Sequence, residues 1–300
     1  MSTPIRCESL SKRFRGVIAV DGLNLQVPEG SMYALVGPNG AGKTTLIKCL
    51  LNLIHPSSGR AWVLDTESRR IAGRDLARIG YVSENQEMPG WMTLEYLLGY
   101  LRPFYPSWDD ELAGRLVADM ELPKGRPLRQ FSRGMKMKAA LVCSLAYRPR
   151  LIVLDEPFGG LDPLVRDEFI QGLLDLASEA TVFVSSHDLA EVESFASHVG
   201  FLDAGRMQLS EEIGTLTGRF REIEITFGGV PVLPPNWPQS WLRPQASSAV
   251  VRFVESRFDE GRTALDVARV FPDAAAVSIT AMSLREIFLA VARARRAAAA

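Results

Sequence analysis

The chain has 300 residues, which is enough for one large domain or two modest ones. Hydrophobic residues make up 47% of it and support a sizeable core. With 23% charged residues and a formal net charge of −1, it does not resemble a nucleic-acid binder held by bulk charge, and we expect no nucleic-acid partner.

The cysteines and the apolar runs indicate a cellular setting. Cys7, Cys49 and Cys143 are scattered and lack metal-ligand spacing, which favours a reduced, cytosolic compartment. The first residues have no apolar signal core, and no apolar run approaches the roughly 20 residues that span a bilayer. We therefore expect any membrane-spanning part to belong to a partner.

The most specific motif in the chain is a glycine-rich segment between two regular elements. An apolar run at 32–36 predicts a strand before it, and the run at 45–51 predicts a helix after it. The segment matches the phosphate-binding pattern G-x-x-x-x-G-K-[ST] without a mismatch. Its expected ligand-binding residues are Gly37, Pro38, Asn39, Gly40, Ala41, Gly42, Lys43, Thr44 and Thr45.

The chemistry of this segment follows from its residue types. The glycines let backbone N–H groups turn inward, and the helix N-terminus adds positive potential. Lys43 is expected to reach the β- and γ-phosphates, and the Thr44 hydroxyl to ligate Mg²⁺. The alternative is a glycine-rich turn with a merely solvated lysine. Because Gly, Lys and Thr are all in place, we predict binding of a nucleoside triphosphate, with ATP and Mg²⁺ as its cofactors.

Further along the chain, the pattern alternates between helical and strand-like stretches. Residues 85–145 are expected to be mostly helical, with Thr93 as an N-cap. Residues 146–205 return to strand–helix alternation, which implies a parallel sheet with crossover helices.

An apolar run at 151–156 ends in two acidic residues, as expected for a buried strand that meets a ligand. Asp155 would hold Mg²⁺ directly or through water, and Glu156 would orient and deprotonate the attacking water. The alternative is a strand that ends in a solvated acidic turn. Behind a phosphate loop, the metal-and-base interpretation is favoured.

The composition changes after about residue 217. Strand-like segments at 222–227 and 250–254 flank a stretch broken by prolines, namely Pro231, Pro234, Pro235, Pro238 and Pro244. A helix near 260–271, a strand near 275–281 and a helix from Ser283 follow. We predict a domain at 1–217 and a small α+β accessory domain at 218–300. The apolar stripe of the last helix could lie on an anionic membrane, but packing on the accessory domain is favoured.

Taken in order, these motifs resemble the ATP-binding cassette of ABC transporters over about residues 5–215. The resemblance implies an α/β fold with a mostly parallel core sheet, antiparallel N-terminal strands and a helical subdomain at about 85–145. Phe14 is similar to the aromatic residue that stacks on adenine, although it could be an ordinary core residue at a strand end.

The resemblance assigns roles to three further segments. The run 130–135 stands where the family has Leu-Ser-Gly-Gly-Gln and retains Ser132 and Gly134, which in the family donate N–H groups to the γ-phosphate held by a second subunit. Asp162 is similar to the D-loop aspartate, and His187 to the switch histidine.

Two positions depart from the family pattern. Glu84 stands where the family has the Q-loop glutamine, and we expect it to bind a metal-held water in catalysis, with Gln86 as the open alternative. Arg133 replaces a signature glycine, and Met135 replaces the signature glutamine. We expect Arg133 to point into solvent rather than to strengthen the phosphate contact.

The helical region also holds many aromatic residues, namely Trp91, Tyr96, Tyr100, Phe104, Tyr105 and Trp108. The resemblance implies that this subdomain docks a coupling helix of an integral membrane permease. For any single residue, the ordinary core of a small helical layer is the favoured alternative.

The resemblance leads to an ATPase that works as a head-to-tail pair on the cytoplasmic face of the cell membrane. The leading hypothesis is the energy-coupling subunit of an exporter, because the tail from Ser283 is similar to exporter cassettes. A soluble ABC-type ATPase acting on DNA or ribosomes is the rival. It is disfavoured because there is no second cassette and no long charged coiled coil between Lys43 and Ser132.

An importer ATPase with a regulatory C-terminal domain is a third possibility. The family places substrate choice in the membrane subunit.

Overall fold

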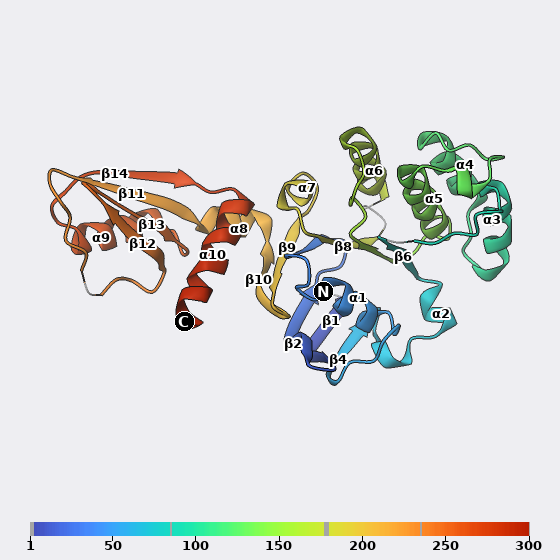
Figure 1. Cartoon of the computed structure of the whole chain (residues 1–300), viewed down its shortest axis with the longest axis horizontal. Coiled ribbons are helices and arrows are strands. Elements are labelled where there is room, and N and C mark those ends of the chain that lie inside the picture. The colour runs from blue at the N-terminus through green and yellow to red at the C-terminus, as the bar shows by residue number, and fades with distance from the viewer. Residues whose placement is uncertain (1–2, 85, 177–179, 235, 300) are drawn as a thin grey trace. The chain divides into compact units, whose positions relative to one another are not determined.

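The structure is a computed structural model that describes residues 3–84, 86–176, 180–234 and 236–299, so Pro235 lies outside the described residues (Figure 1). The chain divides into two compact units, Met1–Ser210 and Glu211–Ala300. This division falls shortly before the predicted boundary at 217. The assignment of the two units as cassette and accessory domain remains a prediction.

A six-stranded sheet forms the centre of the first unit, in the order β10-β9-β3-β8-β7-β6. The β6–β7, β7–β8, β8–β3 and β3–β9 pairs are parallel. Strands β3, β7 and β8 are buried along their whole length, which explains their continuous apolar sequence. The bounds are β3 (Met32–Val36), β6 (Ile79–Ser83), β7 (Leu151–Asp155), β8 (Thr181–Ser186), β9 (His198–Asp203) and β10 (Arg206–Glu212).

A second sheet in the first unit has the order β2-β1-β4-β5, and its pairs are antiparallel. Its strands are β1 (Ile5–Phe14), β2 (Val17–Val27), β4 (Ser58–Val63) and β5 (Thr66–Glu67). Helix α1 (Lys43–Leu50) lies between the two sheets (Figure 1) and buries Leu46, Ile47, Cys49 and Leu50 in their shared core. Packing on both sides therefore fixes the helix that follows the phosphate-binding motif.

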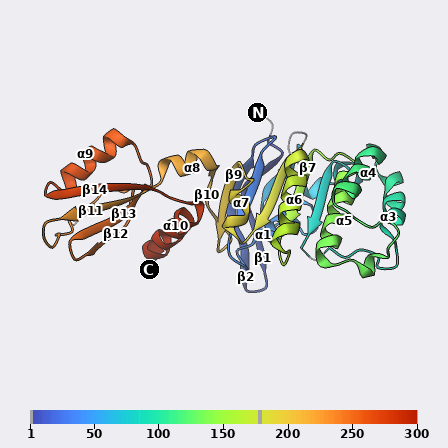
Figure 2. The ribbon, with the colours of Figure 1, turned by 90° about the horizontal axis from the view of Figure 1, so that it is seen from above.

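Helices α3, α4 and α5 form a cluster beyond β6, as Figure 2 shows. Side chains cap all three: Thr93 accepts from the Tyr96 N–H, Asp109 from Leu112 and Ser132 from Met135. The predicted N-cap at Thr93 is confirmed. The helices of the first unit are α1, α2 (Gly73–Leu76), α3 (Leu94–Leu101), α4 (Asp110–Asp119), α5 (Arg133–Leu145), α6 (Pro163–Leu176) and α7 (Leu189–Glu193), with 3₁₀ turns at Ser68–Arg70, Arg102–Phe104 and Leu128–Gln130.

The second unit is an α+β fold on an antiparallel sheet of order β12-β13-β11-β14. Its core contains Ile223, Ile225, Trp241, Val251, Phe253, Val267 and Phe271. Helix α10 buries Leu284, Ile287 and Ala290 and contacts β12, so the predicted packing of its apolar stripe is confirmed. The bounds are α8 (Ile213–Arg219), β11 (Arg221–Phe227), β12 (Trp241–Ser247), β13 (Val250–Glu255), α9 (Glu260–Val270), β14 (Ala274–Ala281) and α10 (Leu284–Ala299).

Strand β12 differs from the sequence-based prediction, in which Pro244 interrupts the chain. Pro244 lies inside the strand, which stands at the edge of the sheet. The pairing register shifts between Leu242 and Gln245, and Arg243 adopts a φ of 52°. An edge strand with a bulge tolerates the missing N–H of proline, so the error has a simple physical cause.

Within the described ranges, no helix is both long enough and apolar enough to cross a bilayer.

We expect a chain that ends at Glu212, the last residue of β10, to fold and to bind nucleotide, because the core cluster around α1 lies entirely in the first unit. Its affinity for a fluorescent ATP analogue should stay within about twofold of that of the full chain. Equilibrium titration and a thermal unfolding curve check this. Loss of cooperative unfolding would show that the first unit needs the second.

Candidate active site

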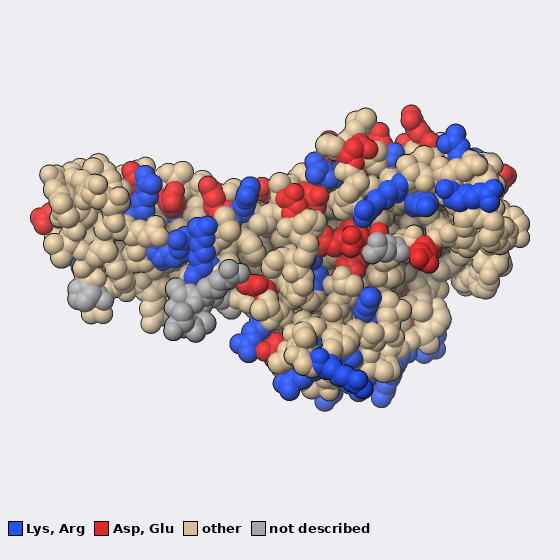
Figure 3. Space-filling model, in the orientation of Figure 1, with Lys and Arg blue, Asp and Glu red and all other residues tan. Residues whose placement is uncertain are grey.

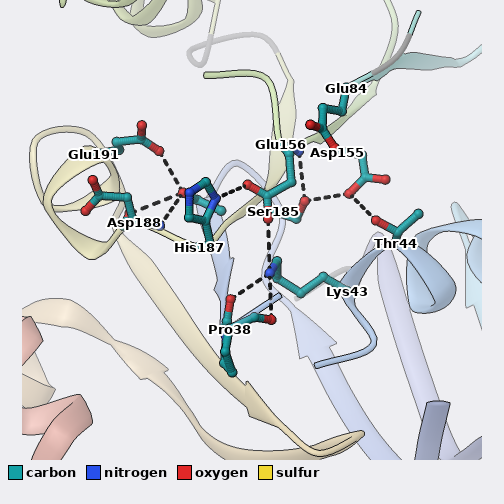
Figure 4. Close-up of polar contacts among 12 residues, drawn as sticks. Pro38, Lys43, Thr44, Glu84, Asp155, Glu156, Ser185, His187, Asp188 and Glu191 are labelled. Atoms are coloured by element: carbon teal, nitrogen blue, oxygen red, sulfur yellow. Dashed lines mark hydrogen bonds and ion pairs between the residues drawn. The ribbon is translucent and has the colours of Figure 1, made fainter. Parts of the chain in front are cut away.

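The parallel sheet brings three segments together at the carboxyl ends of its strands. In register, Val36 of β3 pairs with Ser186 of β8, and Asp155 of β7 pairs with Ser185. The glycine-rich loop, the two acidic residues and His187 follow directly from these strand ends. Figure 4 shows the resulting cluster of side chains. The carboxyl ends of parallel strands are where ligands bind in open α/β sheets.

Two glycines of the loop, Gly37 and Gly42, are required by close backbone contacts. A Cβ at Gly42 would lie 2.1 Å from the Ala19 carbonyl oxygen, and one at Gly37 would lie 2.1 Å from the Leu202 carbonyl oxygen. Gly42 also has a φ of 107°, which an L side chain rarely adopts. Pro38, Asn39 and Gly40 are exposed at the crest of the loop, and Ala41 is buried. Thr44 and Thr45 follow Lys43 in the first turn of α1.

Lys43 holds a buried positive charge at this loop. Its side chain is 5% exposed. The Nζ atom donates to the carbonyl oxygens of Gly37 (2.6 Å) and Pro38 (3.2 Å) and lies 3.0 Å from Oε1 of Glu156. Together with the N-terminus of α1, this ammonium makes the loop suited to an anion.

Asp155 is almost fully buried at the end of β7. Its Oδ1 accepts from Thr44 Oγ1 at 3.1 Å and from Ser185 Oγ at 2.7 Å. Ser185 was not among the functional residues predicted from the sequence. The pairing of β7 with β8 places it beside Asp155. A serine in an otherwise apolar strand is the signal that could have identified it.

These oxygen donors fit Mg²⁺. The ion prefers one or two carboxylates and hydroxyls, with phosphate and water oxygens completing its shell. Asp155 and Thr44 already share a hydrogen bond and therefore face one point. In the described part of the chain, no group of three or more His, Cys, Asp or Glu residues is arranged to hold a metal ion.

Glu156 stands between two basic side chains (Figure 4). Its Oε2 lies 2.7 Å from His187 Nδ1, and its Oε1 faces the Lys43 ammonium. The residue has a φ of 50°, which is unusual for a residue with a side chain, and its N–H donates to Ser185 Oγ. Such strain is typical of active sites. The hydrogen bond to Glu156 raises the pKa of His187.

Two residues whose roles the resemblance assigns, Ser132 and Asp162, accept hydrogen bonds at the starts of helices. Ser132 Oγ accepts from the Met135 N–H and caps α5. Asp162 Oδ1 accepts from the Val165 N–H at the start of α6. A Cβ at Gly134 would lie 3.1 Å from a Val165 methyl of α6 and 3.8 Å from a Leu161 methyl, so the signature segment packs against the D-loop segment and the start of α6.

Phe14 is 50% exposed at the end of β1, and Lys12 Nζ lies 5.0 Å from the centre of its ring. The alternative that Phe14 is a core residue is therefore wrong. Its predicted stacking on adenine remains a prediction.

Glu84 and Gln86 have different surroundings. Gln86 Oε1 accepts from the Ser83 N–H at 3.3 Å, so its amide is turned back toward the end of β6. Glu84 is half-exposed, and its Oε1 lies 3.6 Å from Arg133 Nη2. Arg133 is exposed, as expected for a side chain that points toward solvent, but it also pairs with Glu84 across two segments that only the fold brings together.

A groove of about 380 Å³ lies between the core sheet and the helical subdomain. Leu53, Met88, Leu97, Leu101, Tyr105 and Tyr147 are among its lining residues. Four neighbouring aromatic side chains are largely exposed, namely Trp91 (66%), Tyr96 (56%), Tyr100 (52%) and Phe104 (62%). For these four, the interpretation as ordinary helical core is wrong. Tyr105, which stacks on Tyr147, is only partly exposed.

The phosphate loop and the Asp155–Glu156 pair at one edge of a parallel sheet define a P-loop nucleotide-binding cassette of the ATPase class. Comparison with known proteins extends this assignment, because the sequence profile described as ABC transporter matches residues 20–159. The lantibiotic transport ATP-binding protein SrtF of Streptococcus pyogenes is 33% identical, over 69% of this chain and 90% of that protein. The chain therefore belongs to the family of ABC transporter ATP-binding proteins.

Other relatives are similar over the same region. An uncharacterized ABC transporter ATP-binding protein of Nostoc is 36% identical over 67% of this chain. The chain spans 62% of that relative's length and 60% of the length of a similar protein of Synechocystis. A solved ATP-binding subunit of an ABC transporter superposes with a TM-score of 0.66 at 26% identity, covering 72% of this chain and 92% of that chain. The predicted fold class is confirmed.

The pKa of His187 gives a direct test of the site. Because the hydrogen bond to Glu156 raises it above the ordinary 6.5, Glu156→Gln should bring it back toward that value, as measured by NMR titration of the imidazole. The stability that this pair contributes is present below pH 6.5 and is lost as pH rises through the raised folded pKa. An unchanged pKa in the variant would contradict the pairing.

Proposed function

We propose that this chain binds and hydrolyses ATP and thereby powers a membrane exporter, as its peripheral subunit on the cytoplasmic face of the cell membrane. The observation that carries the proposal is Glu156, which is held between Lys43 and His187 next to the phosphate loop. Support for export comes from relatives named as lantibiotic and bacitracin transport proteins and as a probable multidrug transporter.

Each residue of the site has a distinct task in this proposal. The loop N–H groups and Lys43 hold the triphosphate, and Thr44 and Asp155 hold Mg²⁺, which neutralises phosphate charge when bound. Ser185 fixes the Asp155 carboxylate by its hydrogen bond. Glu156 accepts a proton from the attacking water, and His187 orients Glu156.

The signature segment supports a head-to-tail pair of two copies. Ser132 and Gly134 belong to the segment that starts α5, and Ser132 hydrogen-bonds within that helix rather than to its own phosphate loop. In the proposed pair, each copy's signature segment would face the nucleotide held by the other copy, with Asp162 near the shared interface. A cassette solved as a post-hydrolysis dimer with ADP and Pi, MJ0796, superposes with a TM-score of 0.62 at 22% identity, which supports a common fold.

The groove and the exposed aromatic residues support docking of a permease helix. The lining of the groove is mainly apolar, and exposed tyrosine and tryptophan are typical of protein interfaces. Acidic and basic side chains are interspersed on the face drawn in Figure 3, which does not favour a nucleic-acid surface there.

Glu156→Gln should retain ATP binding and lose turnover, because it keeps the geometry and removes the proton acceptor. We expect kcat to fall by about 100-fold or more. The variant should accumulate as an ATP-held dimer in size-exclusion chromatography. Turnover like that of the unchanged chain would remove Glu156 from the mechanism.

Lys43→Ala serves as the control for that experiment. Losing a desolvated charge contact should weaken binding of a fluorescent ATP analogue by about 10-fold or more, so this variant should not form the ATP-held dimer. Unchanged affinity would mean that the loop is not the binding site.

Co-expression with a candidate permease tests the membrane role. We expect the chain to move to the membrane fraction only with that partner, and Trp91→Ala or Tyr96→Ala to weaken the association by about fivefold or more. Val277→Ala, on the exposed side of β14 in the other unit, is a matched control with no expected effect. Binding of the lone chain to DNA or ribosomes, with no response to a permease, would favour the soluble rival.

A further inference from the structure

Arg133 links three segments that are distant in sequence. Its Nη2 lies 3.6 Å from Glu84 Oε1. A Cβ at Gly160 would lie 2.9 Å from Nη1, and one at Gly159 would lie 3.6 Å from Nη2. The guanidinium therefore occupies the space that a Cβ at Gly160 would fill and lies in van der Waals range of Gly159.

The three segments belong to different parts of the first unit. Arg133 is the first residue of α5 in the helical subdomain, and Glu84 directly follows β6 of the core sheet. The glycine pair lies between β7 and α6, and Gly160 has a φ of 71°. Gly160 is thus required by its backbone conformation, and the end of the flexible Arg133 side chain lies beside it.

The charge balance at this edge of the sheet explains why Glu84 needs a cation. Figure 4 places Glu84 beside Asp155 and Glu156. Lys43 is already engaged by Glu156, and Asp155 is held by hydroxyl groups. Among the described residues, the ion pair of Glu84 is with Arg133. An unpaired Glu84 would add negative charge where the triphosphate is expected to bind.

We propose that Arg133 is a positioning residue for Glu84 and that the two form a charge-coupled unit that tunes nucleotide binding. The inference rests on the proposed function and concerns the regulation of the same site. Glu84 and Arg133 both depart from the family pattern. The proposal explains the two departures together, because the acid at 84 is matched by the base at 133.

The Arg133–Glu84 pair acts by orienting Glu84 and not by stabilising the fold. Both side chains are about half exposed, 51% for Arg133 and 47% for Glu84, and exposed ion pairs contribute little to folding. Since Arg133 begins a helix of the subdomain that lines the groove, a movement of that subdomain relative to the core would change the hold on Glu84. A partner that docks at the groove would thereby change nucleotide binding.

A double-mutant cycle tests the proposal on the full-length chain, with Arg133→Gln, Glu84→Gln and the combined variant. The readouts are the equilibrium Kd for a fluorescent ATP analogue and, separately, kcat and KM for ATP. Arg133→Gln should weaken analogue binding by about three- to fivefold. In the combined variant the Kd should return to within about twofold of that of Glu84→Gln, because no unpaired acid remains.

Three controls make the result specific. Arg133→Lys keeps the charge and should restore most of the affinity. Arg129→Gln removes the same charge from an exposed neighbouring position and should leave Kd within about twofold. Gln86→Ala should also leave Kd unchanged, since its side chain is turned toward Ser83.

Additive effects of Arg133→Gln and Glu84→Gln would overturn the proposal, and so would an Arg129→Gln effect as large as that of Arg133→Gln. Unfolding temperatures of all variants should match that of the unchanged chain, and a loss confined to Arg133→Gln would show a structural role instead. Failure of the unchanged chain to bind the analogue would count against the proposed function itself, so the two failures are distinguishable.

Discussion

The buried ammonium of Lys43 is the interaction on which the arrangement of the site depends. A cation that is 5% exposed must be compensated, and two loop carbonyl oxygens and Glu156 supply that compensation. Glu156 reaches Lys43 only because β7 and the loop after β3 end at the same edge of one sheet, separated by β8. His187, at the end of β8, completes the set from the other side. The electrostatics of the site are therefore a consequence of strand order.

The rest of the first unit supports this edge. Helix α1 is packed between two sheets, so its N-terminus and the phosphate loop have little freedom to move. The helical subdomain contributes the signature segment and the exposed aromatic surface, and its α5 contacts β6. Arg133 and Glu84 connect this subdomain to the core at the end of β6, so one ion pair links the subdomain that carries the proposed permease surface to the site proposed for ATP.

Much of the site could be predicted because its motifs are local. The phosphate loop, the acidic end of β7 and the N-cap at Thr93 each depend on a few consecutive residues, whose preferences are expressed in the sequence itself. The exposed aromatic residues were harder to interpret. An aromatic residue at helical spacing fits a core as well as an interface, and only neighbouring elements decide which. Strand β12 was missed for a related reason, because Pro244 is acceptable only at an edge.

The nucleotide-binding motifs, the α/β class and a second, proline-interrupted region could all be predicted from the sequence alone. Strand pairing and helix packing were needed to show that Ser185 holds Asp155, that the Gln86 amide bonds to Ser83 and that Arg133 pairs with Glu84. The physical reason is how far apart in the sequence the interacting residues lie. Turns, caps and glycine conformations are set by neighbours in the chain, whereas hydrogen bonds and ion pairs between segments exist only after strand pairing and helix packing have brought those segments together.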